Sequence, residues 1–324
     1  MAEHASIFAL CAAPLTLAVL VLPHASILEV ASVLDPMRNA NRQAGREAFS
    51  WRVVSPDGAA VPLTCALSLP SSGGIAAADG ADVLAVIAGY RRAEVVTRPL
   101  ITALRRLAPR FRAILGIDAG PWVLARAGLL DGHRATVHWE DLEDFAAAWP
   151  AVDVVPDRFV ISGNRVTVGG AAPAADVMLH LIRARLGPGI ALQVQQSFLT
   201  TARPGSDPQV MGPGPDSALA RDPRLVAALA RMEQHLDAPE SVAATAGAVG
   251  LSVRRLEGLF RAELGQSPAA WGRELRLQAA RRLITDTRHP LGDIALRTGF
   301  GAQAALSRAF RRRFGRPPSD IRRR

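Results

Sequence analysis

SVAATAGAVGLSVRRLEGLFRAELG occupies residues 241–265, and LGDIALRTGFGAQAALSRAFRRRFG occupies residues 291–315. Each stretch predicts a short alanine-rich helix, a turn that contains glycine, and a longer helix with arginines on one side. A single pattern of this kind is weak support for DNA binding, because helical hairpins are common in structural bundles. Two copies about 50 residues apart predict an all-helical, double helix-turn-helix domain that binds double-stranded DNA.

The excess positive charge lies in the same part of the chain. The 324 residues carry 38 basic against 29 acidic residues, a formal net charge of +9. From Arg221 onward there are 20 arginines against 10 acidic residues, which leaves 18 against 19 in the first 220 residues. A near-neutral part followed by a basic part is typical of a DNA-binding domain attached to another domain.

Helical periodicity separates a polar and an apolar face in each longer helix, the first of which is expected to begin after Ser252. Pro268 suits the first turn of a connecting helix that runs to about Thr285. Any single arginine is equally well explained as a solvated charge, but the stripes as a whole favour DNA contact. The candidate DNA-binding residues are Arg254, Arg255, Glu257 and Arg261 in the first helix and Gln303, Ser307, Arg308, Arg311 and Arg312 in the second.

Three motifs carry a family resemblance: DIALRTGF at residues 293–300, LSRAFRRRFG at 306–315 and PPSDIR at 317–322. With them, residues 224–322 resemble the AraC/XylS family of bacterial transcription regulators. The resemblance implies dimers that recruit RNA polymerase. It also implies base-edge contacts, in which arginine favours guanine, glutamine favours adenine and glutamate accepts from cytosine. The residues that would make them are Arg254, Glu257, Gln303 and Arg308.

Two positions depart from the family pattern. Gly258 and Ala304 stand where relatives often carry a longer polar side chain. Each recognition helix is therefore expected to contact fewer bases directly.

The composition changes just upstream of Pro223. The run TARPGSDPQVMGPGPDSALARD at residues 201–222 is rich in proline, glycine and aspartate and continues neither a strand nor a helix. We therefore expect an N-terminal domain at 1–200, a linker at 201–222 and the DNA-binding domain at 223–324. The first 200 residues are enough for a domain with its own core.

Short apolar runs alternate with amphipathic segments in the N-terminal domain. The alternation predicts an α/β fold with a doubly wound, flavodoxin-like parallel sheet, in which ligands bind beyond the carboxyl ends of the strands. The expected strands are Leu15–Leu22, Trp51–Ser55, Val83–Ile87, Phe111–Ile117, Thr136–His138 and Arg165–Val168. The expected helices are Ile27–Gln43, Arg98–Leu107 and Trp122–Ala127.

One strand-to-helix turn has the layout of a nucleophile elbow. The strand FRAILGI at residues 111–117 is followed directly by Asp118, Ala119, Gly120 and Pro121, and then by a helix. A sharp step of this kind presents one side chain above the sheet. Here that side chain belongs to Asp118.

Further motifs extend the comparison: DPMRNANR at residues 35–42, AGLLDG at 127–132, ATVHWE at 135–140 and VGGAAPAADVML at 168–179. They resemble the ThiJ/PfpI domain, similar to class I glutamine amidotransferases, of GlxA-type AraC regulators. In enzymes of this fold the elbow residue is cysteine, and a carboxylate replaces a thiolate poorly. We therefore expect a ligand-sensing domain without catalytic activity and without a cofactor or metal.

With an aspartate at the elbow, the chain also resembles the subgroup of these regulators that controls catabolism of glycine betaine, carnitine and basic amino acids such as arginine. This implies a small-molecule effector, a quaternary amine or an amino acid. Asp118 would pair with its cation, and fold analogy brings Glu29 to the same site, where two carboxyls share a proton or attract a cation. The other candidate ligand-binding residues are Trp122, Trp139 and Tyr90, as aromatic faces for an ammonium, and His138, as a donor to a ligand carboxylate.

Each candidate ligand residue also has a structural explanation. Asp118 suits a turn or a helix cap, and Glu29 suits an exposed helix surface. The aromatic residues suit core packing, and His138 suits a hydrogen-bonded core position.

The residues together predict a ligand-responsive transcription regulator, with activation favoured over repression. Two alternatives stay open: a constitutive DNA-binding protein whose N-terminal domain only dimerises, and an active ThiJ/PfpI-type enzyme.

The apolar run at residues 5–23 lacks a basic segment before it and is interrupted by Pro14, so we expect a cytoplasmic protein without a membrane anchor. Cys11 and Cys65 have no metal-ligand spacing, and we expect both to be reduced thiols.

Overall fold

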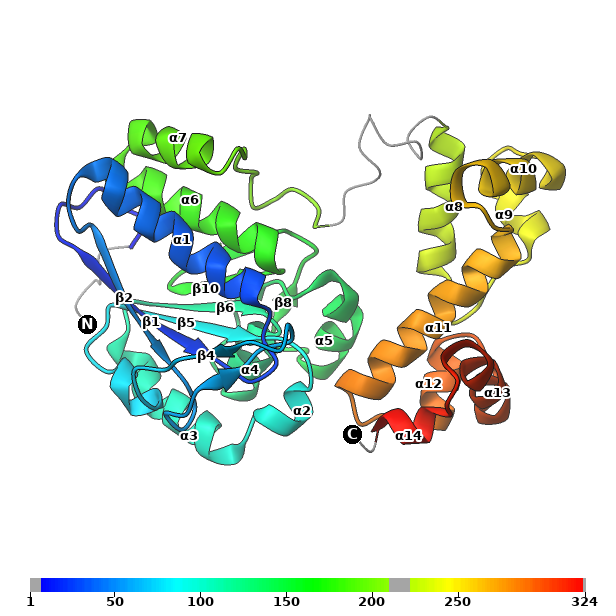
Figure 1. Ribbon diagram of the computed structural model, residues 1–324, viewed down its shortest axis with the longest axis horizontal. Coiled ribbons are helices and arrows are strands. Elements are labelled where there is room, and N and C mark those ends of the chain that lie inside the picture. The colour runs from blue at the N-terminus through cyan, green and yellow to red at the C-terminus, as the bar shows by residue number, and fades with distance from the viewer. Residues whose placement is uncertain (1–6, 210–221, 323–324) are drawn as a thin grey trace. The chain divides into compact units, whose positions relative to one another are not determined.

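A computed structural model describes residues 7–209 and 222–322 (Figure 1). The chain divides into two compact units, one in each of these ranges. Each unit has hydrophobic cores of its own. Among the described residues, the helices are too short or too polar to span a membrane.

A six-stranded sheet in the order β2-β1-β5-β6-β10-β9 forms the centre of the first unit. Neighbouring strands run parallel except for the antiparallel pair β9 and β10. The predicted doubly wound sheet is therefore confirmed. The strands are β1 (Leu15–Val21), β2 (Phe49–Val54), β5 (Val83–Ala88), β6 (Ala113–Asp118), β9 (Phe159–Ser162) and β10 (Arg165–Val168). Two short ribbons pair β3 (Val61–Pro62) with β4 (Ser68–Leu69) and β7 (Arg134–Ala135) with β8 (Asp153–Val154).

Helices cover both faces of the sheet because successive residues of its strands point to opposite sides. In β1, Leu17 and Val19 pack with one helical layer, and Ala18 and Leu20 pack with the other. The first layer consists of α1 (Ile27–Ala44), α6 (Ala171–Leu186) and α7 (Pro188–Ser197), which lie on one side of the sheet in Figure 1. The second contains α3 (Arg98–Leu107), α4 (Gly120–Arg126) and α5 (Leu142–Ala148). Short helical turns complete this unit: α2 (Arg92–Val95), η1 (Ile75–Ala78), η2 (Ala108–Arg110) and η3 (Trp139–Asp141).

One expected strand is wrong. Residues 136–138 form no strand, and β7 ends at Ala135. The backbone N–H of Thr136 donates to the hydroxyl of Thr167 (2.8 Å), and the carbonyl of Val137 accepts from the side chain of Gln209 (2.8 Å). Because side chains take these backbone groups, no strand ladder forms here.

The structure also differs from the linker expected at 201–222. The backbone N–H of Arg203 donates to the carboxylate of Asp176 (3.0 Å), and the carbonyl of Gly205 accepts from the N–H of Arg158 (2.8 Å). Residues 203–209 are thus bound to the first unit, because glycine and proline here allow a close approach to the sheet edge. The rest of the expected linker, residues 210–221, lies outside the described residues.

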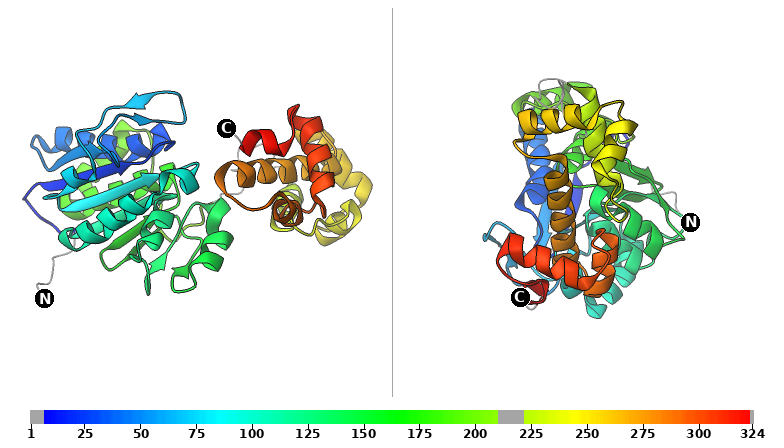
Figure 2. Two further views of the ribbon diagram at one scale, coloured as in Figure 1. Left: turned by 90° about the horizontal axis from the view of Figure 1, so that it is seen from below. Right: turned by 90° about the vertical axis from the view of Figure 1, so that its right-hand side faces the viewer.

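The second unit is all-helical and contains the two expected helix-turn-helix motifs (Figure 2). Leu256 and Phe260 are fully buried in one small core, and Leu306 and Phe310 are fully buried in the other. The connecting helix α11 supplies side chains to both cores. The helices are α8 (Pro223–Gln234), α9 (Val242–Ala248), α10 (Val253–Leu264), α11 (Pro268–Asp286), α12 (Leu291–Arg297), α13 (Gln303–Phe314) and α14 (Pro318–Arg322).

The expected helix starts of the first motif are confirmed. The hydroxyl of Ser252 accepts from the N–H of Arg255 and caps α10, and Pro268 begins α11 after a cap by Ser267. A serine cap satisfies a backbone N–H that a helix start otherwise leaves without a partner. These caps define where the first recognition helix and the connector begin.

We predict that Gly120→Ala lowers the free energy of unfolding of the first unit by about 1–3 kcal/mol. A Cβ at Gly120 would lie 2.4 Å from the carbonyl oxygen of Val86 in β5, so β5 and α4 would have to separate. Urea unfolding followed by tryptophan fluorescence measures the change. Gly189→Ala is the matched control, because an added Cβ there meets nothing within 4 Å. Equal stabilities of the two variants would contradict this packing argument.

Candidate ligand site and DNA interface

The elbow at the end of β6 holds Asp118 in a strained conformation. Its φ of 59° lies in the left-handed region, which few residues other than glycine adopt, although aspartate and asparagine do so more often than most. The next residue, Ala119, is anchored by its N–H to the carbonyl of Ala88 in β5 (2.9 Å). Ala119 is the N-cap of α4, and no side chain caps that helix. The explanation of Asp118 as a helix cap is therefore wrong, and the elbow presents its carboxyl beyond the ends of the strands.

Glu29 comes from the first turn of α1, the helix that follows β1. Its carboxylate accepts from the N–H of Ser26 (3.4 Å), and the Ser26 hydroxyl accepts from the N–H of Leu28 (3.2 Å). This capping arrangement turns Glu29 inward, where it is 6% exposed and hydrogen-bonded to the carboxyl of Asp118. The explanation of Glu29 as an exposed helix residue is wrong, and its carboxyl lies against that of Asp118.

Two carboxyl groups in contact away from water cannot both ionise at neutral pH. Burial, followed by the charge of Asp118, raises the pKa of Glu29 to about 9. Burial also raises the pKa of Asp118 to about 7, although its hydrogen bond to Glu29 acts in the opposite direction. The pair therefore titrates as one unit and holds a shared proton near pH 7. We refer to Glu29 and Asp118 as the acid pair.

Charged neighbours act on the acid pair from the segment after β7 and from α2. The charges of Asp141 and Glu140 raise the pKa of Asp118, and the charge of Arg92 lowers it. The guanidinium of Arg92 donates to the carboxylate of Asp141 (2.8 Å), which also accepts from the indole N–H of Trp122 (3.0 Å). The surroundings thus carry more negative than positive charge, which favours a cationic ligand.

The four remaining candidates fall into two groups. Trp122 packs edge-on against Phe145 (5.0 Å between ring centroids), and Arg92 lies over its face (4.3 Å), so it is part of the wall. Tyr90 is 52% exposed and Trp139 is 40% exposed. These two side chains are exposed to solvent, whereas Trp122 is partly buried. His138 stacks near Trp139 (5.9 Å), and its Nδ1 lies 4.0 Å from the carboxylate of Glu140.

Sequence reasoning did not identify three residues of this site: Arg92, Asp141 and Gly89. An ion pair between residues 49 apart leaves no local pattern in the sequence. The sequence did carry a local signal for Gly89, because this residue directly follows the buried strand β5. A Cβ there would lie 3.0 Å from the carbonyl of His24 and 3.5 Å from the carboxylate of Asp118. A side chain at this strand end would crowd the carbonyl of His24, which a glycine avoids.

The described residues contain no group of three or more histidine, cysteine, aspartate or glutamate side chains arranged to hold a metal ion. Cys11 and Cys65 are both free thiols. The elbow therefore presents a carboxyl group and no thiol. Its chemistry is that of an anion that pairs with cations or shares a proton.

The two recognition helices present the faces that periodicity predicted. Leu256 and Phe260 of α10 and Leu306 and Phe310 of α13 are fully buried. Most candidate DNA contacts are exposed, and Glu257 and Ser307 are partly exposed; the exposed ones are Arg254, Arg255, Arg261, Gln303, Arg308, Arg311 and Arg312. The carboxylate of Glu257 lies 4.0 Å from the guanidinium of Arg261. Each helix thus has a basic side opposite its buried side.

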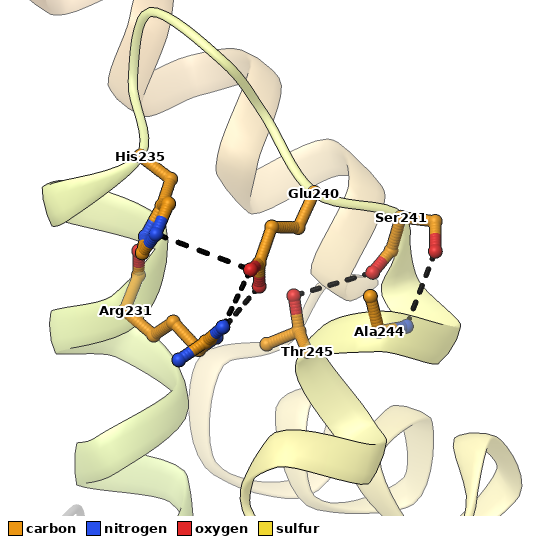
Figure 3. A network of polar contacts seen from close by, with 6 residues as sticks. All are labelled: Arg231, His235, Glu240, Ser241, Ala244 and Thr245. Atoms are coloured by element: carbon orange, nitrogen blue, oxygen red, sulfur yellow. Dashed lines mark hydrogen bonds and ion pairs between the residues drawn. The ribbon is translucent and has the colours of Figure 1, made fainter.

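An ion-pair network holds α8 against the first motif (Figure 3). The guanidinium of Arg231 donates to both carboxylate oxygens of Glu240 (2.6 and 2.7 Å), and Nε2 of His235 lies 4.0 Å from the same group. The adjacent Ser241 caps α9 by accepting from the N–H of Ala244 (3.1 Å). The network therefore ties α8 to the start of α9.

One arginine of the second motif and one of the connecting helix make contacts within the protein. The guanidinium of Arg313 in α13 donates to the carboxylate of Glu274 in α11 (2.7 Å). Arg276 of α11 donates to the carbonyl of Gly299 (2.9 Å) and lies over the ring of Phe300 (5.0 Å). These contacts dock α13 and the turn before it on the connecting helix. They set Arg313 apart from the other arginines of α13.

A parallel α/β unit with an elbow at its strand ends, followed by two helix-turn-helix motifs on one connecting helix, defines a class of DNA-binding transcription regulators. Comparison with known proteins agrees with this class. Residues 18–184 match the DJ-1/PfpI family, and residues 245–324 match a helix-turn-helix domain.

The similarity to known regulators extends over almost the whole chain. It is 35% identical to the HTH-type transcriptional regulator CdhR of Pseudomonas aeruginosa, over 94% of this chain and 90% of that protein. It is 33% identical to the HTH-type transcriptional regulator GlxA of Rhizobium meliloti, over 92% of this chain and 93% of that protein. The solved structure of an AraC family transcriptional regulator from Pseudomonas putida is 26% identical, with a TM-score of 0.53, and covers 57% of this chain and 100% of that one. The chain belongs to the DJ-1/PfpI family and, within it, to the transcriptional regulators that carry an AraC-type helix-turn-helix domain.

We predict that the free energy of unfolding of the first unit decreases as pH rises from about 5 to about 9. Both carboxyls of the acid pair ionise near 4.5 and 3.8 in the unfolded chain but keep protons to about 9 and about 7 when folded. The folded state therefore binds more protons in this interval, and stability is lost as pH rises through it, on the scale of about 1.4 kcal/mol per pKa unit.

Urea unfolding at several pH values, followed by tryptophan fluorescence, measures this loss. The control is the double variant Glu29→Gln, Asp118→Asn, which keeps the shape of both side chains and removes both titrations. Its stability should depend less on pH than that of the wild type. Identical pH profiles for the two proteins would contradict the raised pKa values.

We predict that Arg308→Ala weakens binding to a specific DNA site by about 1–3 kcal/mol and relaxes the preference at one base pair. A DNA site selected from a random library, with fluorescence anisotropy on single-base variants, measures both effects. Arg313→Ala is the contrasting variant, because Arg313 is held by Glu274, and it should keep the base preference. An unchanged preference in Arg308→Ala would remove Arg308 from the interface.

Proposed function

We propose that this regulator binds a small cationic or zwitterionic nitrogen metabolite at the acid pair and responds by activating transcription. The observation that carries the proposal is the pair itself: Glu29 is 6% exposed and hydrogen-bonded to Asp118 at the carboxyl ends of the strands. In α/β folds of this type ligands bind at that edge of the sheet. A cation that replaces the shared proton would let both carboxyls ionise without repulsion.

The surroundings favour a quaternary ammonium or a guanidinium group. Tyr90 and Trp139 expose aromatic rings on two neighbouring segments, and such rings attract ammonium groups. Asp141 and Glu140 add negative charge. His138 and Arg92 lie in the same segments, and either side chain could exchange its present partner for the carboxylate that a betaine or an amino acid carries.

The proposal includes no catalytic step. The elbow residue is a carboxyl that burial keeps partly protonated, and a protonated carboxyl is a poor nucleophile. Binding energy at this site would instead shift the population of two arrangements of the protein. We further propose that the regulator works in the cytoplasm as a homodimer on promoter DNA and recruits RNA polymerase.

A thermal-shift screen of the full chain tests the effector. The compounds are glycine betaine, carnitine, choline, arginine and other amino acids, each with wild type, Asp118→Ala and the control Asp131→Ala, an exposed aspartate. A ligand at about 100 times its Kd should stabilise the protein by about 2.7 kcal/mol. We expect one class of compound to raise the Tm of the wild type and of Asp131→Ala and to leave Asp118→Ala unchanged.

The other outcomes separate the alternatives. A shift that survives in Asp118→Ala would keep a ligand-binding domain and contradict the acid pair as its site. Flat curves with every compound would favour an N-terminal domain that only dimerises.

A further inference from the structure

The segment after α7 runs along the antiparallel edge of the sheet. The N–H of Arg158 donates to the carbonyl of Gly205 (2.8 Å), and Asp157 and Pro208 pair as an antiparallel bridge. We call residues 203–209 the strap. It pairs with residues 157–159, where β9 begins.

The beginning of the strap is tied to a buried ion pair. The guanidinium of Arg158 donates to the carboxylate of Asp176 in α6 (2.5 and 2.9 Å), and both side chains are less than a tenth exposed. The other carboxylate oxygen of Asp176 accepts from the backbone N–H of Arg203 (3.0 Å). Breaking one partner of a buried ion pair is strongly unfavourable. The beginning of the strap is therefore fixed.

The end of the strap is held by one side chain, that of Gln209. Its Nε2 lies within hydrogen-bond distance of the hydroxyl of Thr136 (2.8 Å) and of the carbonyls of Val137 (2.8 Å) and Asp157 (2.9 Å). Its Oε1 is buried without a hydrogen-bond partner among the described residues. An unsatisfied buried carbonyl opposes the docked state. The end of the strap is therefore bound less firmly than its beginning.

The floor beneath Gln209 is Gly169. A Cβ there would lie 2.3 Å from the amide of Gln209, so the side chain docks only because this residue is glycine. The φ of Gly169 is not in the left-handed region, and an alanine can adopt it. Gly169→Ala would therefore displace Gln209 without straining the backbone.

The partners of Gln209 and the neighbours of the acid pair belong to one segment. Thr136 and Val137 accept hydrogen bonds from Gln209. Glu140 and Asp141 lie three to five residues further along the same segment, and their charges raise the pKa of Asp118. A displacement of this segment by a ligand would change both sets of contacts. Gln209 is also the last described residue of the first unit, and the DNA-binding unit follows it in the chain.

We propose that the strap is a latch that couples the acid pair to the DNA-binding unit, with Gln209 docked in one state and released in the other. The inference rests on the proposed function, because it describes how ligand binding at the acid pair would reach the DNA-binding unit. Coupling between two sites is reciprocal. A change at the acid pair must alter the docking of Gln209, and release of Gln209 must alter the acid pair.

Hydrogen–deuterium exchange of the full chain tests the latch. The peptides of interest cover the strap and residues 134–141, in wild type, Gln209→Ala, Gly169→Ala and Asp118→Asn. Gln196→Ala, an exposed glutamine in α7, is the control. We expect both latch variants to speed exchange of the strap at least about threefold and to alter residues 134–141. Asp118→Asn should alter the strap, and Gln196→Ala should alter neither segment.

The results distinguish failure of the latch from failure of the proposed site. Unchanged strap exchange in Asp118→Asn would overturn the latch, whatever the ligand is. A second arm adds choline chloride as the probe. If choline raises the Tm of the wild type but leaves strap exchange unchanged, the latch is wrong and the site stands. If choline leaves the Tm unchanged while Asp118→Asn still alters the strap, the latch stands and choline is excluded as the effector.

Discussion

The hydrogen bond between Glu29 and Asp118 joins the first turn of α1 to the end of β6, and the chemistry of the first unit depends on it. One carboxyl comes from the helix that follows β1 and the other from the end of β6, and the two meet at the carboxyl edge of the sheet. Two buried carboxylates repel each other unless a proton or a cation lies between them. The fold therefore keeps an acid pair that holds a proton near neutral pH.

The second unit depends on a different constraint, the rigidity of α11. Both small cores include side chains from this helix, and ion pairs and backbone hydrogen bonds dock α13 on it. The positions of the two basic faces are therefore coupled within the unit. Both recognition helices are therefore held in place by packing within the unit.

Local patterns predicted the elements and part of the site. Continuous apolar runs marked β1, β5 and β6, the strand-turn-helix step marked Asp118, and helical periodicity marked the exposed faces of α10 and α13. The approach of Glu29 to Asp118 came from resemblance alone. The ion pair of Arg92 with Asp141 and the docking of Gln209 join residues 49 and more apart. Such contacts depend on tertiary packing. The stretch around Gln209 is rich in proline and glycine, so its sequence predicts a linker, and only the folded structure shows its partners.

The most direct test of the account is a carbon-13 NMR titration of the side-chain carboxyls of Glu29 and Asp118 in the full chain. Signals are assigned by difference from Glu29→Gln and Asp118→Asn. The account predicts that at least one of the two carboxyls stays protonated above pH 7, and that the titration of each changes when the other is replaced. Two independent titrations near the ordinary values of 4.5 and 3.8 would contradict it, because the shared proton would then not exist.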